Sequence, residues 1–253
     1  MKEQLYTIPL NDAVAADDEC PFCFIERKVT QDLLDHVLGS GSTYMEADMR
    51  DLTDRAGFCR THFKMMFDYG NTLGNAWILK THTMHLNEDF HRVAASFRPE
   101  RKSLLQRMKK SEDAPNPISM FIRKRRESCY ICEEFEKMYA RYLDTFFYLW
   151  ENDDAFRSKI TGGKGFCLTH FGDLCDAADG KLGGRDLEDF YGTLLPVMEK
   201  NLARLHEDVA WLVEKYDYRN KDADWKNSRD AIQRAMQKLK GGYPADAPYR
   251  QNK

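Results

Sequence analysis

The sequence predicts an all-α protein made of two duplicated helical modules, each held together by a metal site with three cysteine ligands and one histidine. Three observations support this prediction. Apolar residues recur every three or four positions over much of the chain, as they do along one face of a helix, and no run alternates as a strand would. The 253 residues include only 15 glycines and 8 prolines, which favours long helices over many short strands. A pattern of cysteine and histidine occurs twice, once in each half of the chain.

The repeated pattern has two parts. The segment Gly57–Phe63 begins Gly-Phe-Cys and continues to a histidine and a phenylalanine, and the same order returns at Gly165–Phe171. A Cys-x-x-Cys stands about 35 residues before the cysteine of each segment. We therefore expect a first module over residues 1–110 and a second over residues 118–253, which includes a C-terminal helical tail. Each module is long enough for a core of its own, and we expect the two to pack as one body.

The first half predicts four helices after an extended lead-in at residues 1–19. Apolar residues stand at every fourth position from Ile25 to Val37 and predict a helix that starts within the first Cys-x-x-Cys. The small residues at 39–42 should end it. The other helices of this half are expected at residues 45–55, from Cys59 to Gly70, and at residues 74–96.

The second half repeats the helix pattern of the first half after an expected linker at residues 98–120. Pro115 and Pro117 of this linker cannot stand inside a helix. Residues 132–150 predict a helix so rich in aromatic side chains that it must be largely buried. Apolar residues then step by three and four from residue 187 to residue 212 and give the clearest helix prediction of the chain. Pro196 should kink this helix or mark a new start. Further helices are expected at residues 152–161, at residues 170–179 and from Ser228 to Gly241.

The repeated cysteines and histidines have the chemistry of metal ligands. A Cys-x-x-Cys or a Cys-x-x-His at the start of a helix points two ligand atoms to one side, and two such pairs give four tetrahedral ligands. Three thiolates and one imidazole suit Zn²⁺. The sequence predicts two such sites, one from each module. The first set is Cys20, Cys23, Cys59 and His62, and the second is Cys129, Cys132, Cys167 and His170.

Four protein ligands fill the coordination sphere of zinc, whereas catalytic zinc usually keeps one position open. The two ions are therefore expected to be structural. An iron–sulfur cluster is a less favoured cofactor for the same ligands. Buried core thiols are a less favoured interpretation, because they do not explain the matched histidines. Disulfides are less favoured because a reducing compartment is expected. A thioredoxin-like dithiol needs a βαβ setting that this sequence does not show.

Composition limits the other roles. The formal net charge is −3, so no overall field attracts the chain to nucleic acid or membranes. No secretory signal and no apolar run long enough to span a bilayer are visible, which predicts a cytoplasmic protein without a membrane partner. In that reducing compartment, paired cysteines are more often metal ligands than disulfides.

Three weaker signals have ordinary explanations. Cys175 stands where the first half has Phe67, so we expect it to fill the core. His82, His85 and Asp89 share one helix face and could bind a metal, but a solvated polar face is the favoured reading. The basic run from Arg123 to Arg126 could contact phosphate, but without interleaved aromatic residues in the adjacent segment it does not predict a nucleic-acid site.

The motifs resemble those of an uncharacterised bacterial family. Its members carry Cys-Pro-x-Cys near the start of a helix and Gly-Phe-Cys-x-x-His some 35 residues later. The stretch from Tyr142-Leu143-Asp144 to Gly165-Phe166-Cys167 and the tail from Tyr218 to Ala231 are typical of that family. The resemblance covers nearly the whole chain, although Tyr130 replaces the proline of the family motif. It implies no activity.

The sequence favours a zinc-stabilised helical protein with a non-enzymatic interaction or scaffold role, acting on a protein partner that it does not identify. The alternative is a redox enzyme or sensor that uses the two cysteine sites, as thiols or as iron–sulfur clusters.

Overall fold

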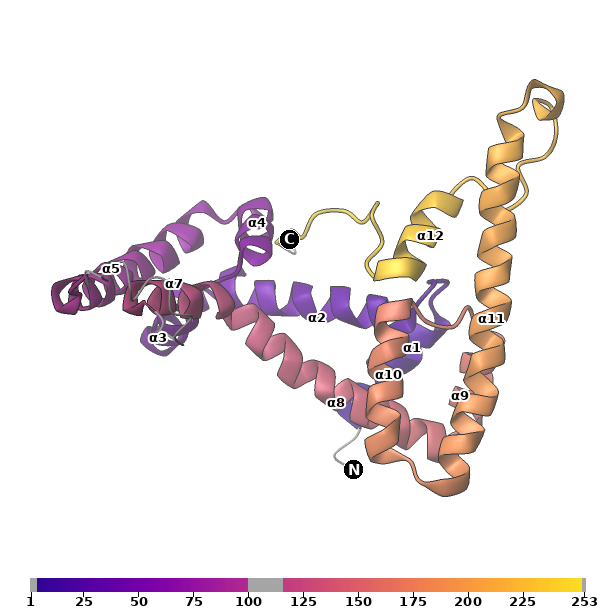
Figure 1. The fold of residues 1–253 in the computed structure, drawn as a ribbon, viewed down its shortest axis with the longest axis horizontal. Coiled ribbons are helices and arrows are strands. Elements are labelled where there is room, and N and C mark those ends of the chain that lie inside the picture. Colours follow the sequence, from indigo (N-terminus) through magenta and orange to yellow (C-terminus); the bar gives the residue numbers. More distant parts are fainter. Residues whose placement is uncertain (1–3, 100–115, 252–253) are drawn as a thin grey trace, which may run out of the picture. The chain divides into compact units, whose positions relative to one another are not determined.

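The computed structural model describes residues 4–99 and 116–251, and within these ranges the chain forms helices and no strand (Figure 1). The all-α prediction is confirmed. Eleven α-helices and two short 3-10 helices are present in the described ranges.

Contacts divide the chain into two compact units, and each unit takes residues from both halves of the sequence. The first unit contains Met1–Val29 and Lys137–Ala247, and the second contains Thr30–Glu136 and Pro248–Lys253. The boundaries fall inside two long helices, α2 (Pro21–Leu38) and α8 (Tyr130–Asn152). These units differ from the predicted modules 1–110 and 118–253, and the duplication itself stays a prediction.

The other helices lie within one unit each. The first unit contains α1 (Gln4–Ala15), α9 (Asp154–Gly162), α10 (Leu168–Lys181), α11 (Gly184–Lys215), the 3-10 helix η2 (Tyr218–Asn220) and α12 (Ala231–Lys240). The second unit contains the 3-10 helix η1 (Thr43–Met45), α3 (Ala47–Ala56), α4 (Arg60–Tyr69), α5 (Thr72–Ser96) and α7 (Pro117–Glu127).

Aromatic side chains form the core of the first unit. Phe146 of α8 lies at its centre and is fully buried. Its ring meets Phe156 of α9 edge to face at a centroid distance of 5.6 Å, and it meets Phe166 in the same way at 5.9 Å. Trp150 of the same helix packs edge to face on Phe190 of α11. These geometries are the preferred ones for ring pairs, and they explain why the aromatic run of α8 predicts burial.

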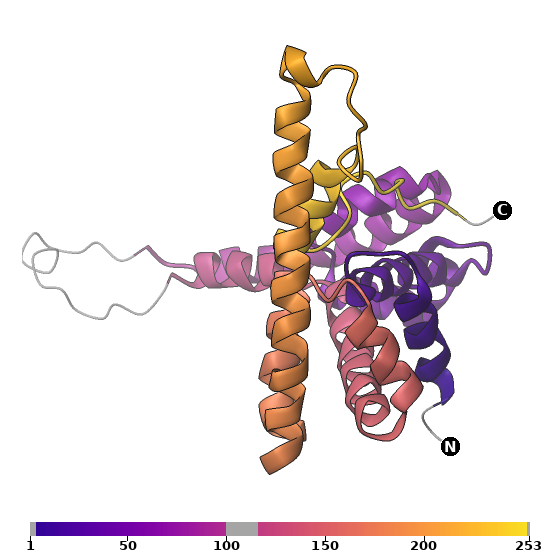
Figure 2. The ribbon, with the colours of Figure 1, turned by 90° about the vertical axis from the view of Figure 1, so that its right-hand side faces the viewer.

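The 32-residue helix α11 is the longest described helix, and it covers the segment with the clearest helical periodicity. It continues through Pro196, so the expected restart at this residue is wrong; Pro196 is exposed, and the apolar residues on either side keep their 3.6-residue period. Helix α12 packs against both α10 and α11, and Figure 2 shows α12 lying beside α11.

The N-terminal residues correct the prediction of an extended lead-in, because α1 occupies most of that stretch. Leu10 and Ala13, three positions apart on one face, are completely buried, and α1 packs against α9. The stretch gave no helical signal because Pro9 stands inside it and its apolar face is short. Packing against α9 therefore decides this helix.

In the second unit, α5 packs against α3 and α7. Gly70 ends α4 in the left-handed conformation, as expected from the sequence. The Asn71 side chain caps α5 by accepting a hydrogen bond from the Gly74 amide. Pro117 is the first residue of α7 and Asn116 is its cap, so part of the expected linker is helical. Residues 100–115 of that linker lie outside the described residues.

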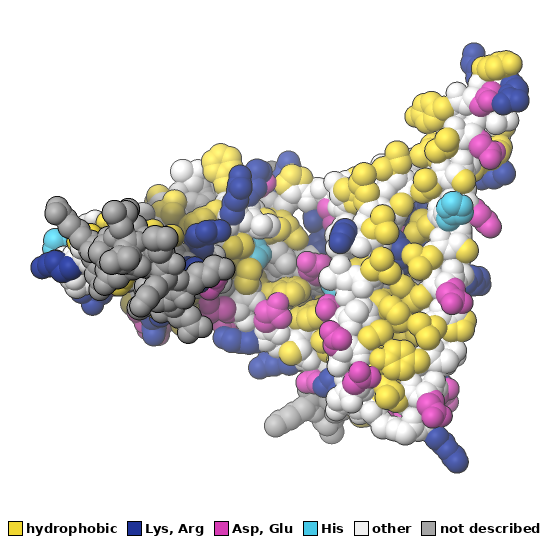
Figure 3. All heavy atoms as spheres, viewed as in Figure 1, with side chains coloured by type: hydrophobic (Ala, Val, Ile, Leu, Met, Phe, Trp, Pro, Cys, Tyr) yellow, Lys and Arg dark blue, Asp and Glu magenta, His cyan; other side chains and the backbone are white. Residues whose placement is uncertain are grey.

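The exposed surface of the first unit includes large apolar side chains, and Figure 3 shows hydrophobic atoms gathered over α10 and α11. The exposed apolar side chains of the first unit include Leu168 of α10 and Leu195 of α11, and also Ile232, Met236 and Leu239 of α12. Among the described residues, no helix has both the length and the apolar character needed to cross a membrane.

Candidate metal centres

The structure brings the eight predicted ligands together in two clusters, and each cluster mixes the two halves of the chain. The four ligand atoms of each cluster lie within 4.8 Å of one another. We call Cys20, Cys23, Cys167 and His170 the inner cluster, because all four residues are buried. We call Cys59, His62, Cys129 and Cys132 the outer cluster, because three of its four residues are partly exposed.

This arrangement corrects the predicted pairing within each module. The structure gathers the same eight residues, but each Cys-x-x-Cys meets the Gly-Phe-Cys-x-x-His of the other half. The helices that follow the cysteine pairs are the physical reason. With a rise of about 1.5 Å per residue, α2 carries the chain about 27 Å from its own cysteines and α8 about 35 Å. Each helix begins in one unit and ends in the other, so the turn that follows it belongs to a different unit from the cysteine pair that precedes it.

Both Cys-x-x-Cys pairs lie at helix starts, as predicted. Cys20 stands directly before α2 and Cys23 lies in its first turn, where the Cys23 amide donates to the Cys20 carbonyl oxygen at 3.0 Å. Cys129 and Cys132 have the same places at the start of α8. The free amides and the dipole of a helix N-terminus favour thiolates at these positions.

The two Gly-Phe-Cys turns have matching local structures. Gly57 and Gly165 have φ angles of 64° and 73°, which side chains rarely adopt. The next residue in each turn, a phenylalanine, is buried, and Cys59 and Cys167 are the N-caps of α4 and α10 with extended backbones. The histidine follows in the first turn of the helix, on the same side as the cysteine. Only glycine allows this turn to aim both ligands at one point.

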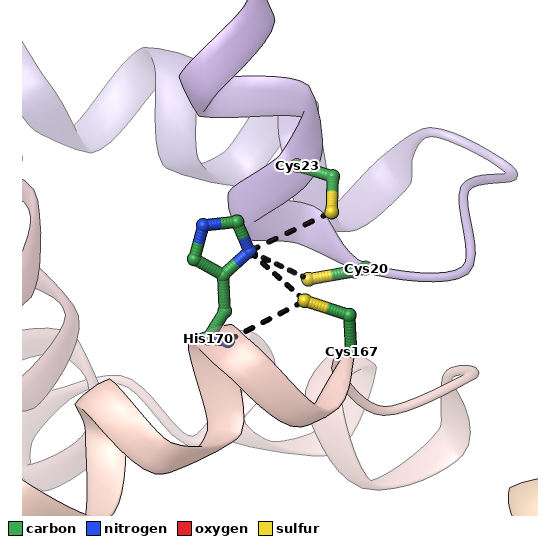
Figure 4. Close-up of side chains that lie close together, drawn as sticks. All are labelled: Cys20, Cys23, Cys167 and His170. Atoms are coloured by element: carbon green, nitrogen blue, oxygen red, sulfur yellow. Dashed lines mark hydrogen bonds between the residues drawn. The ribbon is translucent and has the colours of Figure 1, made fainter. Parts of the chain in front are cut away.

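In the inner cluster, three sulfur atoms surround one ring nitrogen (Figure 4). The Nδ1 atom of His170 lies 3.2 Å from the Cys167 Sγ, 3.4 Å from the Cys20 Sγ and 3.5 Å from the Cys23 Sγ. The His170 backbone amide also donates to the Cys167 sulfur at 3.4 Å. All four ligand atoms thus converge on one point.

The outer cluster has the same arrangement. The Nδ1 atom of His62 lies 3.2 Å from the Cys129 Sγ, 3.3 Å from the Cys59 Sγ and 3.4 Å from the Cys132 Sγ. The sulfur atoms of Cys59 and Cys132 are 3.9 Å apart. The Tyr130 amide donates to the Gly57 carbonyl oxygen at 2.9 Å, which joins the start of α8 to the Gly57 turn.

These distances match those of a tetrahedral zinc site. Bonds of about 2.3 Å to sulfur and about 2.0 Å to nitrogen place a sulfur and a nitrogen ligand about 3.6 Å apart and two sulfur ligands about 3.8 Å apart. Both clusters therefore fit one metal ion of this size, held by three thiolates and one imidazole.

The inner cluster has a carboxylate behind its histidine. The second ring nitrogen of His170, Nε2, lies 3.6 Å from the Glu26 Oε2. A carboxylate in this place orients a ligand histidine and makes its metal-binding nitrogen more basic. The rings of Phe22 and Tyr139 lie 5.9 and 5.8 Å from the imidazole and enclose it in the aromatic core. At the position of the outer cluster that corresponds to Glu26, the sequence has Phe135.

Hydrogen bonding prepares one inner ligand for metal. Burial raises the pKa of the Cys20 thiol well above its usual value. Hydrogen bonds from Cys20 and then from Cys23 hold the pKa of Cys167 far below its usual value. Burial alone would lower the pKa of His170, but hydrogen bonds with Cys167 and Cys23 raise it to about 10. The cluster thus favours a thiolate at Cys167, which is the form that binds metal.

The outer ligands differ in their protonation. Burial lowers the pKa of His62, which favours the neutral imidazole that metals bind. Burial opposes ionisation of Cys59, but hydrogen bonds from the His62 amide and from Cys129 and Cys132 lower its pKa overall. Burial raises the pKa of Cys132 to about 12. Of Cys59 and Cys132, Cys59 therefore ionises more readily, and its side chain is partly exposed.

A buried ion network that no sequence pattern predicted supports the inner cluster. Glu19, next to Cys20, is 2% exposed and accepts from Arg204 at 2.6 Å. The Lys238 ammonium of α12 is 1% exposed and donates to the carbonyl oxygens of Glu19 and Lys164 at 2.6 and 2.7 Å. These bonds hold α12 against the two segments that lead into the inner ligands.

The weaker sequence signals belong to other interactions. His85 Nδ1 lies 3.0 Å from the Asp54 Oδ2, and Asp89 forms ion pairs with Arg92 and Arg125, so the face of α5 that carries them is a polar packing face. Among the described residues, these side chains form no metal-binding group. Cys175 is only partly buried, so the prediction that it fills the core is correct in part, while Phe67, its counterpart, is exposed.

A family model described as "Family of unknown function (DUF6062)" matches residues 1–246. The chain belongs to this family. The match confirms the resemblance to an uncharacterised family, and it includes all eight ligand residues of the two clusters. No curated protein and no solved structure matches the chain. The description of DUF6062 assigns no activity, so the chemistry of the site must carry the functional argument.

Proposed function

We propose that each cluster binds one structural zinc ion and that the two ions stabilise a helical scaffold for a protein partner in the cytoplasm. The observation that carries this proposal is the convergence of three sulfur atoms and one ring nitrogen, twice, at distances that fit tetrahedral zinc. The soft thiolate set favours zinc over magnesium or calcium.

The structural role follows from the ligand count. Four protein ligands leave no position for a water or a substrate, so the ion has no open site for catalysis. Each ion instead joins segments that are far apart in the sequence. The inner cluster links residues separated by about 150 positions and the outer cluster links residues separated by about 70 positions. Because an unfolded chain has no such site, the binding energy of each ion becomes folding energy.

The scaffold role rests on the surface rather than on the clusters. Exposed apolar side chains of α11 and α12, such as Leu195, Met236 and Leu239, offer contact area for a protein. Nucleic acid is a poor partner, since the net charge is negative and the basic residues of α7 lie on one short helix.

The test is the metal itself. Purified protein should be colourless and contain two zinc ions per chain by elemental analysis. A strong chelator should remove them with a parallel loss of helical circular dichroism and of the thermal transition. Retention of the helices and of the melting temperature after complete demetallation would contradict the structural role.

A second function rests on the outer cluster. The thiol of Cys59 is partly exposed and its pKa is lowered, which is the environment of a cysteine that oxidants reach. A redox sensor, or an iron–sulfur protein, is the alternative. A brown preparation that absorbs visible light and bleaches on reduction would favour this function over the scaffold.

A further inference from the structure

A pocket of about 530 Å³ lies in the second unit, where the Gly57 turn meets α5 and α7. Two ring pairs form much of its wall. Phe58 and Phe63 have centroids 5.5 Å apart, and Phe90 and Phe121 have centroids 6.2 Å apart. The volume lies within the range of roughly 300–1,000 Å³ that small-molecule sites occupy. The aromatic lining selects an apolar occupant.

The charges at this pocket are all positive. Its lining includes Arg125 and Arg126 but no aspartate or glutamate. Arg125 is already occupied, because it forms an ion pair with Asp89 and donates to the Arg55 carbonyl oxygen at 3.0 Å. The Arg126 side chain is exposed, and its guanidinium forms no hydrogen bond or ion pair within the described parts of the chain. The pocket therefore combines apolar walls with one uncommitted guanidinium.

The polar floor of the pocket is fixed by the Gly57 turn. The Nδ1 atom of His82 lies 3.2 Å from the Asp54 carbonyl oxygen and donates to it. A side chain at residue 57 would come within 2.9 Å of the imidazole, so glycine at this position lets the ring approach the turn. The ring is thus held in place beside the cavity, and the site is formed before any ligand arrives.

We propose that this pocket binds an apolar molecule that carries one carboxylate. The hydrocarbon would lie against the four phenylalanine rings, and the carboxylate would pair with the Arg126 guanidinium, whose fork suits two carboxylate oxygens. A cation would meet two guanidinium groups, and a neutral molecule would leave Arg126 unused. Charge complementarity therefore selects the acid. The pocket is separate from the ligand atoms of both clusters, so the proposal does not depend on which metal they hold.

The test uses the full chain with its metal and the dye 8-anilinonaphthalene-1-sulfonate, an aromatic anion whose fluorescence rises in apolar sites. We expect saturable binding to one site, displaced by decanoate or 1-naphthoate at concentrations at least tenfold lower than by 1-decanol. Arg126→Gln should lower the affinity for decanoate at least tenfold and leave the affinity for 1-decanol unchanged. Asn87→Trp, which places an indole at the lining of the pocket, should remove dye binding.

The matched control is Arg123→Gln, which makes the same change of charge on the same helix outside the pocket. It should bind decanoate as the unmodified protein does. Absence of saturable dye binding, or equal displacement of the dye by decanoate and 1-decanol, overturns the proposal. Both results are obtained with the unmodified protein, so they do not depend on the folding of a variant. Metal content and thermal melting are measured on each sample, so failure of the zinc proposal is seen separately as absent metal.

Discussion

The inner and outer clusters use the same four ligand types in the same local geometry, yet their surroundings differ. The inner ligands are buried among aromatic rings, with Glu26 behind the histidine and the Glu19–Lys238 network beside the first cysteine. The outer ligands lie near the surface, and only Cys129 is buried. The comparison shows that the same Cys-x-x-Cys and Cys-x-x-His motifs can form a buried cluster or a partly exposed one. The residues packed around the four side chains decide how much solvent reaches them.

The largest expected effect tests which ligands share an ion. The double variant Cys20→Ser with Cys167→Ser removes two inner ligands and should leave one metal ion per chain. Cys20→Ser with Cys59→Ser disables both clusters and should leave none, with a loss of most of the folded structure, since each ion supplies folding energy on the order of 10 kcal/mol. Elemental analysis and circular dichroism measure both results. No ion in the Cys20/Cys167 variant and one ion in the Cys20/Cys59 variant would instead support ligand sets drawn from within each half of the chain.

The next effect concerns the support of the inner cluster. Lys238→Met removes the buried ammonium that holds the segments before Cys20 and Cys167, and should cost about 3 kcal/mol of unfolding free energy. Lys240→Met changes an exposed lysine of the same helix and should cost less than about 0.5 kcal/mol. Urea unfolding measures both. Equal stability of the two variants would show that the network does not support the cluster.

The Gly-Phe-Cys turns should be sensitive in both clusters. Gly57→Ala and Gly165→Ala force a methyl group into the left-handed region, where it would lie 2.9 Å from the His82 ring or 3.0 Å from the Met198 sulfur. We expect a cost of about 2–3 kcal/mol in each case. Gly70 also has a positive φ, but it lies in the αL region, and a methyl group there would have its nearest atom 3.9 Å away, so Gly70→Ala should cost only about 1 kcal/mol. Thermal melting that ranks Gly70→Ala with the other two would contradict the steric argument.

The smallest effect isolates the carboxylate of the inner cluster. Glu26→Gln should weaken metal binding there by about tenfold, the low end of the usual range, because the Glu26 side chain is 45% exposed. The outer ion should be unaffected. Competition with a chromophoric chelator resolves the two ions. Glu133→Gln, an exposed change beside the outer cluster, is the control. A loss of affinity at the outer cluster alone would show that Glu26 does not act on His170.

Several parts of the fold could be predicted because they depend on local periodicity. The aromatic helix α8 and the long helix α11 have apolar residues at helical spacing over many turns, and both are present. Helix α1 could not be predicted, since Pro9 obscures its short apolar face and the burial of Leu10 comes from α9. The burial of Lys238 could not be predicted either, because no local sequence pattern indicates that this lysine is buried.

The sequence by itself identified the eight cysteine and histidine residues that the structure gathers into two clusters, and the turns that present four of them. Spacing fixes two ligands on one turn of a helix, and the glycine before each Phe-Cys allows the required backbone. Tertiary structure alone decided which pairs meet, because α2 and α8 each begin in one compact unit and end in the other. It also decided which cluster is protected, since burial depends on side chains such as Phe22, Glu26 and Lys238 that approach from elsewhere in the chain.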